Sequence, residues 1–239
     1  MTTVSQLATL ADIVYSSHMP LAQQGIPTGV TRLDRATPPS STGFSGGVYQ
    51  VGGCAVITFR GTDKTSAMDW MHNAGCHSLL ATQFSEAMLF AQSAIATHHL
   101  AAGSTYICGH SLGGGLTKYV THNLTQSGFS PLGGISFNGP GLTSGAFERG
   151  LVTVLGPGAM FLHWALSRSD TPNSRSSAKI ANVNIVGDLV SQIGNSAGRI
   201  HNIPPSNGAG DPLTCHFMST VVPSVAASAL GNMRGAQIV

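Results

Sequence analysis

The feature that most constrains the fold is a five-residue motif, Gly-His-Ser-Leu-Gly, at residues 109–113. An apolar run at residues 105–108 precedes it and is typical of a buried strand, and a helical pattern follows as far as residues 127–128. A tight strand-to-helix turn exposes the oxygen of its serine, and its flanking glycines allow a close backbone approach that no side chain would permit. The motif therefore predicts Ser111 as a nucleophile.

The same glycine–serine pattern occurs at two other places, because the chain contains 30 glycines. Residues 43–47 place Ser45 after a stretch of proline and serine and before a predicted hairpin. Residues 194–198 place Ser196 before a short β-like run. Only Ser111 has a buried strand before it and a helix after it, so the context selects it among the three.

The remaining elements alternate between helix and strand. A helical pattern covers residues 6–15, and a hairpin with its turn at Gly52-Gly53 covers residues 47–60. Three more elements are predicted: a helix at residues 84–102 that stops at Gly103, and strands at residues 134–138 and 180–186. The polar, proline-rich residues 20–41 carry no predicted element. Together with the serine turn, this order predicts one α/β-hydrolase domain over residues 1–239, with a mostly parallel central sheet flanked by helices.

The acid and the base of a serine hydrolase of this fold follow the nucleophile in that order. Asp188 ends the strand at residues 180–186, where the sheet presents its catalytic groups. Asp170 and Asp211 are alternatives, but both lie among Pro, Ser and Gly and are typical of turns. Only His201 and His216 follow Asp188. We favour His216, which stands where a loop meets an apolar, helix-like tail, and His201 stays open as the alternative base.

An oxyanion hole is predicted at residues 58–62, which end a buried strand ahead of the serine turn. In this fold a backbone N–H group from that loop joins the N–H group after the nucleophile. The prediction assigns Thr62 and Leu112, with the Thr62 hydroxyl as a third donor. A simple turn at Gly61 is the alternative explanation.

A long excursion at residues 142–177 separates two predicted strands and has an apolar middle. It leaves the carboxyl edge of the sheet, where α/β folds bind their ligands. Met160, Phe161 and Trp164 are predicted to line the acyl pocket and its mouth. A helix packed wholly into the core is the alternative.

Composition narrows the function. A net charge of +2 without a basic cluster excludes a nucleic-acid binder. The ten histidines and four cysteines form no spaced metal motif, so no metal site is expected. Pairing of Cys76 with Cys215 stays open. Charged residues make up only 8% of the chain, against roughly 25% in an average soluble protein, which suits contact with an apolar interface.

Targeting signals are not evident. The first twenty residues lack a basic start and an unbroken apolar segment, so no cleavable signal peptide is expected. This leaves the cytoplasm or export by another route. The longest apolar stretch, residues 151–166, is interrupted by Gly156-Pro157-Gly158 and is too short to span a bilayer.

Four segments of the chain resemble the class 3 lipases, the family of filamentous fungal lipases and related phospholipases. They are residues 59–62, 109–114, 137–141 and 182–190. The resemblance implies hydrolysis of lipid esters without a cofactor, and a triad of Ser111, Asp188 and His216. It also implies that Asp69 supports the side chain of the oxyanion hole.

Two departures from that family bear on mechanism and substrate. The interval from Asp188 to His216 is shorter than the family usually shows, and so is the segment from Thr62 to Asp69, which predicts a reduced or missing lid helix. The substrate class stays open between lipid esters and small soluble esters or thioesters. An inert binding protein on a hydrolase scaffold is disfavoured, because Ser, Asp and His are all present in the required order.

Overall fold

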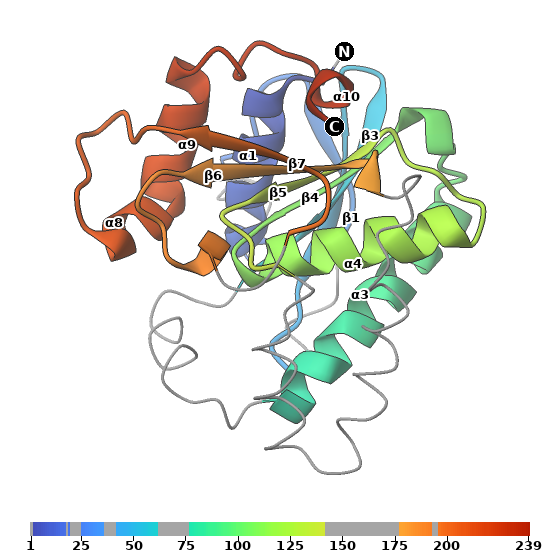
Figure 1. Cartoon of the computed structure of the whole chain (residues 1–239). Helices are drawn as coiled ribbons and strands as arrows, with labels where there is room; N and C mark the ends of the chain where they lie inside the picture. Colours follow the sequence, from blue (N-terminus) through green and yellow to red (C-terminus); the bar gives the residue numbers. More distant parts are fainter. Residues whose placement is uncertain are drawn as a thin grey trace.

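A computed structural model describes residues 2–17, 19, 25–35, 42–61, 77–141, 177–192 and 196–239, with the backbone alone for residues 77–81 (Figure 1). Its strands form one sheet in the order β1-β2-β3-β4-β5-β6-β7. The strands are β1 (Val30–Arg35), β2 (Gly46–Val51), β3 (Cys54–Phe59), β4 (Thr105–His110), β5 (Gly133–Phe137), β6 (Ile180–Ile185) and β7 (Arg199–Ile203). Pairing is antiparallel from β1 to β3 and parallel from β3 to β7, which confirms the predicted, mostly parallel sheet.

The predicted hairpin is formed by β2 and β3. Val51 pairs with Cys54 across the turn, and the two residues between them, Gly52 and Gly53, have φ angles of 57° and 81°. A two-residue turn with positive φ at both positions matches the twist of the flanking strands and favours glycine. This turn sets the register of β3, whose last residue, Phe59, pairs with Gly109 at the start of the serine motif.

Helices cover both faces of the sheet (Figure 1). They are α1 (Val4–Ile13), η1 (Val14–Ser16), α3 (His77–Thr97), η4 (Ala102–Ser104), α4 (Leu112–Gln126), η5 (Val190–Gln192), α8 (Pro212–His216), α9 (Met218–Ala227) and α10 (Gly235–Ile238). Helices α3 and α4 pack together on one face, and α1, α9 and α10 lie on the other. Right-handed crossovers between successive neighbouring strands place α3 and α4 on the same face.

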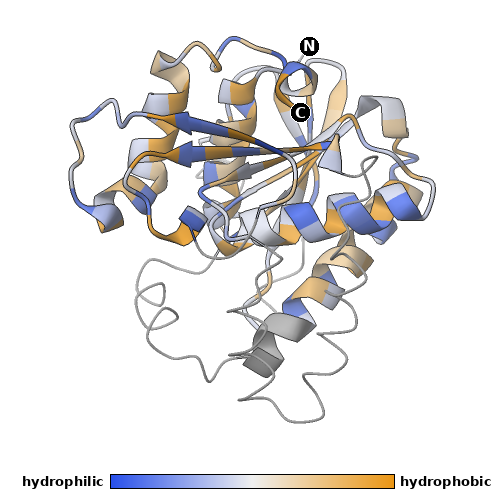
Figure 2. Ribbon diagram, in the orientation of Figure 1, coloured by the Kyte–Doolittle hydropathy of each residue, from blue (hydrophilic) through white to orange (hydrophobic). Residues whose placement is uncertain are grey.

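A hydrophobic core lies between the sheet and each layer of helices. The inner strands β3 to β6 are almost wholly buried, and Figure 2 colours much of this interior as hydrophobic. On one side Ile57 and Phe59 pack with Leu116 and Val120 of α4. The other core contains residues of α1, α9 and α10 together with the opposite sheet face. Two cores of this kind hold the carboxyl edge of the sheet rigid, which is the edge that carries the site.

Strand β1 was missed by the sequence analysis, which assigned no element to residues 20–41. Its exposure alternates between intermediate and high, and it carries Arg32, Asp34 and Arg35. An edge strand of this kind is held by backbone hydrogen bonds to β2, so it needs no apolar run. The usual strand pattern is therefore absent.

Helix α3 ends earlier than predicted. It stops at Thr97, and His99 takes the left-handed conformation with a φ angle of 49°. The Leu100 N–H group donates to the Ile95 carbonyl at 3.0 Å, which is the backbone pattern of a Schellman stop. Gly103 lies in η4 and does not end the helix.

Within the described ranges, no helix combines the length and apolar character needed to cross a bilayer.

Candidate active site

Ser111 lies on the sharp turn between β4, which ends at His110, and α4, which begins at Leu112. Its φ and ψ angles are 57° and −128°, a region that costs a non-glycine residue about 1–3 kcal/mol. The Ser111 N–H group donates to the Phe137 carbonyl at 3.0 Å, and the Ser111 carbonyl accepts from Gly114 at 2.8 Å. These bonds hold the serine in the strained position that a nucleophile elbow requires.

The glycines around Ser111 are required by space. A Cβ atom on Gly109 would lie 2.4 Å from the Gly113 carbonyl oxygen, and one on Gly113 would lie 2.2 Å from the Phe59 carbonyl oxygen. A Cβ atom on Gly61 would lie 2.6 Å from the His110 carbonyl oxygen. Any side chain at these positions would push the backbone apart. The glycines therefore let the end of β3, the end of β4 and the start of α4 meet at one point.

His216 lies at the end of α8, and its ring contacts both other members of the predicted triad. Its Nε2 atom is 2.9 Å from the Ser111 Oγ atom, and its Nδ1 atom is 2.7 Å from the Asp188 Oδ1 atom. An ionised carboxylate only accepts hydrogen bonds, so Nδ1 carries the proton. The Nε2 atom is then free to accept the Ser111 hydroxyl proton, as a general base does.

Asp188 follows β6 and is 1% exposed. Besides His216, it accepts a hydrogen bond from the Ser191 N–H group at 2.8 Å, and its own carbonyl accepts one from the Gln192 amide at 2.9 Å. Burial alone would raise the pKa of the Asp188 carboxyl group. The hydrogen bond and charge of His216, together with the Ser191 donors, outweigh burial and hold this pKa below its usual value. Asp188 is thereby kept ionised.

His110, the second residue of the motif, supports the base loop, which is the segment Cys215-His216 at the end of α8 that carries the predicted base. Its Nε2 atom is 2.7 Å from the His216 backbone oxygen, and its Nδ1 atom is 2.9 Å from the Tyr15 hydroxyl oxygen. The carbonyl can only accept, so Nε2 carries the proton and the Tyr15 hydroxyl donates to Nδ1. Sequence analysis missed this role because Tyr15 and His110 lie 95 positions apart.

Asn138, directly after β5, also holds this loop. Its amide nitrogen donates to the carbonyl oxygens of Cys215 and His216 at 2.9 and 3.3 Å. Its amide oxygen accepts from the Ile185 N–H group at 2.8 Å, at the end of the strand that leads to the acid. One side chain therefore links the base loop to β6. Its place in the segment 137–141 that resembles the lipase family was the available signal.

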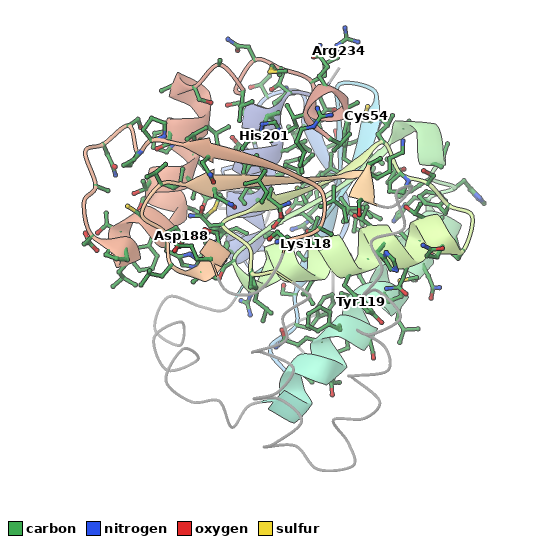
Figure 3. All side chains as sticks on the ribbon, in the orientation of Figure 1. Cys54, Lys118, Tyr119, Asp188, His201 and Arg234 are labelled. Carbon is green, nitrogen blue, oxygen red and sulfur yellow. The ribbon has the colours of Figure 1, made fainter. Side chains whose placement is uncertain are left out.

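The alternatives weighed from the sequence lie elsewhere. His201 is on β7 and bonds the Ile238 carbonyl at 2.8 Å, and Figure 3 labels it well apart from Asp188. Ser45 precedes β2 and its hydroxyl lies 3.0 Å from that of Ser17. Asp211 caps α8 by accepting from the Thr214 N–H group at 2.8 Å. None of these residues adjoins the Ser111 hydroxyl in the way that His216 does.

Part of the predicted site falls outside the described residues. This applies to Asp170, Thr62 and Asp69, to the predicted pocket residues Met160, Phe161 and Trp164, and to Cys76. Leu112 is described and is the first residue of α4, where the N–H groups of a helix have no earlier carbonyl to bind. Cys215 is buried and forms no disulfide. Among the described residues, no group of three or more His, Cys, Asp or Glu side chains is placed to hold a metal ion.

Comparison with known proteins agrees with this geometry. The model of the Tle-like phospholipase domain family matches residues 6–154. No curated protein matches the chain in sequence. The triacylglyceride lipase of Rhizomucor miehei superposes with a TM-score of 0.56 at 15% identity, over 82% of this chain and 77% of that one. A fungal lipase superposes with a TM-score of 0.53 at 13% identity, over 92% and 86%.

A further structure, an MDLA variant from Penicillium cyclopium, superposes with a TM-score of 0.52 at 13% identity, over 87% of this chain and 79% of that one. Structural matches at such low identity show the fold alone, and they confirm the predicted lipase-like α/β-hydrolase architecture. The family match covers more than half of the chain and includes the serine turn. The chain therefore belongs to the Tle-like phospholipase domain family, and it is a serine hydrolase of carboxylic esters of lipids.

Proposed function

We propose that Ser111, His216 and Asp188 are the catalytic residues of a lipid-ester hydrolase whose single domain spans residues 1–239. The observation that carries the proposal is the unbroken hydrogen-bond chain from Asp188 through His216 to Ser111, with distances of 2.7 and 2.9 Å, on a strained elbow. Support for a single domain comes from α1 and α9, which contact each other on one face of the sheet although they come from opposite ends of the chain.

In the proposed reaction the Ser111 oxygen attacks the ester carbonyl while His216 Nε2 takes the serine proton. His216 then gives that proton to the departing alcohol, and an acyl-serine ester remains. Water attacks this ester while losing a proton to His216, and His216 returns that proton to the departing Ser111 oxygen, which releases the fatty acid and the free serine. Asp188 keeps the ring in the correct tautomer and stabilises the imidazolium that forms.

The negative charge on the reacting carbonyl oxygen requires hydrogen-bond donors. We assign this role to the N–H groups of Leu112 and Thr62, with the Thr62 hydroxyl steadied by Asp69. The position of Leu112 at the start of α4 supports the first assignment, and the close contact of Gly61 with Ser111 supports the second. Each such donor contributes about 3 kcal/mol to stabilising the transition state.

The substrate that we propose is a phospholipid acyl ester presented at a lipid surface. The family description supports the phospholipid class. Contact with a lipid surface is supported by an apolar rim beside the triad, formed by Val186, Leu189 and Leu213, which are 55%, 53% and 36% exposed. The first two flank Asp188 and the third lies on α8, which touches the Asp188 loop. Exposed aliphatic side chains beside a lipid-hydrolysing site suit insertion among acyl chains.

For the acyl chain itself we propose a pocket lined by Met160, Phe161 and Trp164. They belong to the excursion that follows β5 at the carboxyl edge of the sheet, and each buried methylene of a fatty acid contributes roughly 0.8 kcal/mol. Replacing Phe161 and Trp164 with Ala is expected to impair long-chain esters far more than acetyl or butyryl esters. Equal losses on both classes would instead indicate a folding defect.

The proposed function is tested by a substrate panel. Phosphatidylcholine vesicles, emulsified triacylglycerol and short p-nitrophenyl esters are assayed side by side with the wild type and Ser111→Ala. We expect hydrolysis of vesicles to exceed the other two, and every activity to be lost in the variant. Activity confined to short soluble esters would favour an esterase or thioesterase, and activity that survives Ser111→Ala would exclude the proposed nucleophile.

The apolar rim is tested by the double substitution Val186→Ser and Leu189→Ser. Both side chains are exposed, so the fold is expected to tolerate the change. Vesicle hydrolysis should fall because the rim no longer enters the lipid, while the rate on a short p-nitrophenyl ester should stay the same. Unchanged vesicle binding, measured by sedimentation, would contradict the role given to the rim.

A further inference from the structure

A fully buried lysine, Lys118, lies two turns along α4 from the elbow (Figure 3). Its Nζ atom donates to the Gly139 carbonyl at 3.0 Å, to the Pro140 carbonyl at 2.8 Å and to the Ser196 hydroxyl at 3.0 Å. None of these three partners carries a charge. A buried ammonium group without a charged partner is costly, so a residue of this type needs an explanation.

The first two bonds reach the segment after β5. Gly139 and Pro140 directly follow Asn138, whose amide holds the loop that carries His216. Gly139 also packs tightly against the start of α4, since a Cβ atom on Gly139 would lie 2.8 Å from the Gly114 Cα atom. Lys118 therefore fixes the two residues that directly follow Asn138, the residue that positions His216.

The third bond reaches the connection between β6 and β7. Ser196 lies in this connection, and so does Ser191, whose N–H group donates to the Asp188 carboxylate. Asp188 itself stands at the start of the same connection. One lysine on the nucleophile helix is thus bonded to the segment that holds the base and to the segment that holds the acid.

The network suits both protonation states of the lysine. Burial lowers the pKa of Lys118 to about 7. As an ammonium group it donates to all three oxygens. As a neutral amine it donates to the two carbonyls and accepts from the Ser196 hydroxyl. The three segments therefore stay joined on both sides of neutral pH.

We propose that Lys118 is a positioning residue for the triad, which holds the base-bearing and acid-bearing segments against the nucleophile helix. It touches no substrate and acts through Asn138 on one side and through the β6–β7 connection on the other. The proposal rests on the proposed function, because it takes Ser111, His216 and Asp188 as the reacting groups. A substitution far from the reacting groups that displaces one of them by about 1 Å is enough to cost about 100-fold in rate.

The test replaces Lys118 with Met, which keeps the length of the side chain and removes the donors. A matched control is Leu124→Ala, a core change on the same helix whose buried side chain belongs to the hydrophobic cluster between α3, α4 and the sheet. We expect Lys118→Met to lower kcat on a short p-nitrophenyl ester by about 10- to 100-fold with KM within about twofold. Leu124→Ala should lower Tm by at least as much and keep kcat within about twofold.

A Lys118→Met variant with wild-type kcat would overturn the proposal, and so would a Leu124→Ala variant that loses kcat equally. If Lys118→Met does not fold, Ser196→Ala decides by the same readout, since it removes one partner and leaves the lysine in place. We expect kcat of Ser196→Ala to fall at unchanged KM, and an unchanged kcat would overturn the proposal. Failure of the proposed triad is distinguishable, because the Ser111→Ala variant would then retain activity.

Discussion

Burial of Lys118 predicts a specific dependence of stability on pH. The perturbation is again Lys118→Met, and the measured quantity is the free energy of unfolding of the wild type minus that of the variant. The native-state pKa of Lys118 is lowered from 10.5 to about 7 by burial. Between these two values the unfolded chain holds a proton that the native protein has released.

The sign and the size follow from that difference. Stability rises with pH wherever the unfolded state binds more protons, so the wild type gains about 1.4 kcal/mol per pH unit above pH 7 relative to the variant. The complete shift corresponds to about 5 kcal/mol, of which about 3 kcal/mol is gained by pH 9. Below pH 7 both states hold the proton, so the difference between the two proteins should be flat.

The assay is urea unfolding followed by far-ultraviolet circular dichroism at several values from about pH 6 to pH 9. Subtracting the free energy of unfolding of the variant from that of the wild type removes the contribution of other groups that titrate at high pH. Examples are Cys108 and Tyr49, whose pKa values burial raises to about 12. A difference that stays constant across the whole range would refute the reasoning, because it would mean that Lys118 keeps its ordinary pKa in the folded protein.

Four further predictions concern the site. Ser111→Ala should reduce kcat for ester hydrolysis by about 10⁴-fold or more, while Ser45→Ala should leave it unchanged. Asp188→Asn should lower kcat in the same assay by about 10⁴-fold, because it favours the wrong tautomer of His216. Gly113→Ala should lower Tm steeply in thermal unfolding, because its Cβ atom would lie 2.2 Å from a backbone oxygen, and an unchanged Tm would contradict this packing. Asn138→Gly keeps a positive φ angle but removes the amide that bonds the Cys215 and His216 carbonyls, of which only the second keeps another donor, His110, so it should lower kcat and reduce stability by about 1–3 kcal/mol. Wild-type kcat in that variant would show that the loop needs no such support.

The elbow and most of the sheet follow from local pattern. Gly109 and Gly113 flank Ser111 because contacts at 2.2–2.4 Å leave no room for a side chain, and steric limits of this kind are visible in the motif itself. The inner strands are buried on both faces, so each is a short, largely apolar run that is readable without a structure. The edge strand β1 lacks such a run, which is why local pattern overlooked it.

Tertiary contacts decided the rest. His201 and His216 are both acceptable bases by chain order, and only the path of the chain brings His216 to Ser111, 105 positions away, while His201 bonds the C-terminal helix. The same holds for His110 and Asn138, which support the base loop, and for the buried Lys118. Each is an ordinary polar residue in the sequence, and its function comes from a backbone oxygen or hydroxyl group that folding brings to it from another segment. Backbone acceptors are the same for every residue type, so no sequence pattern reveals which carbonyl a buried donor will meet.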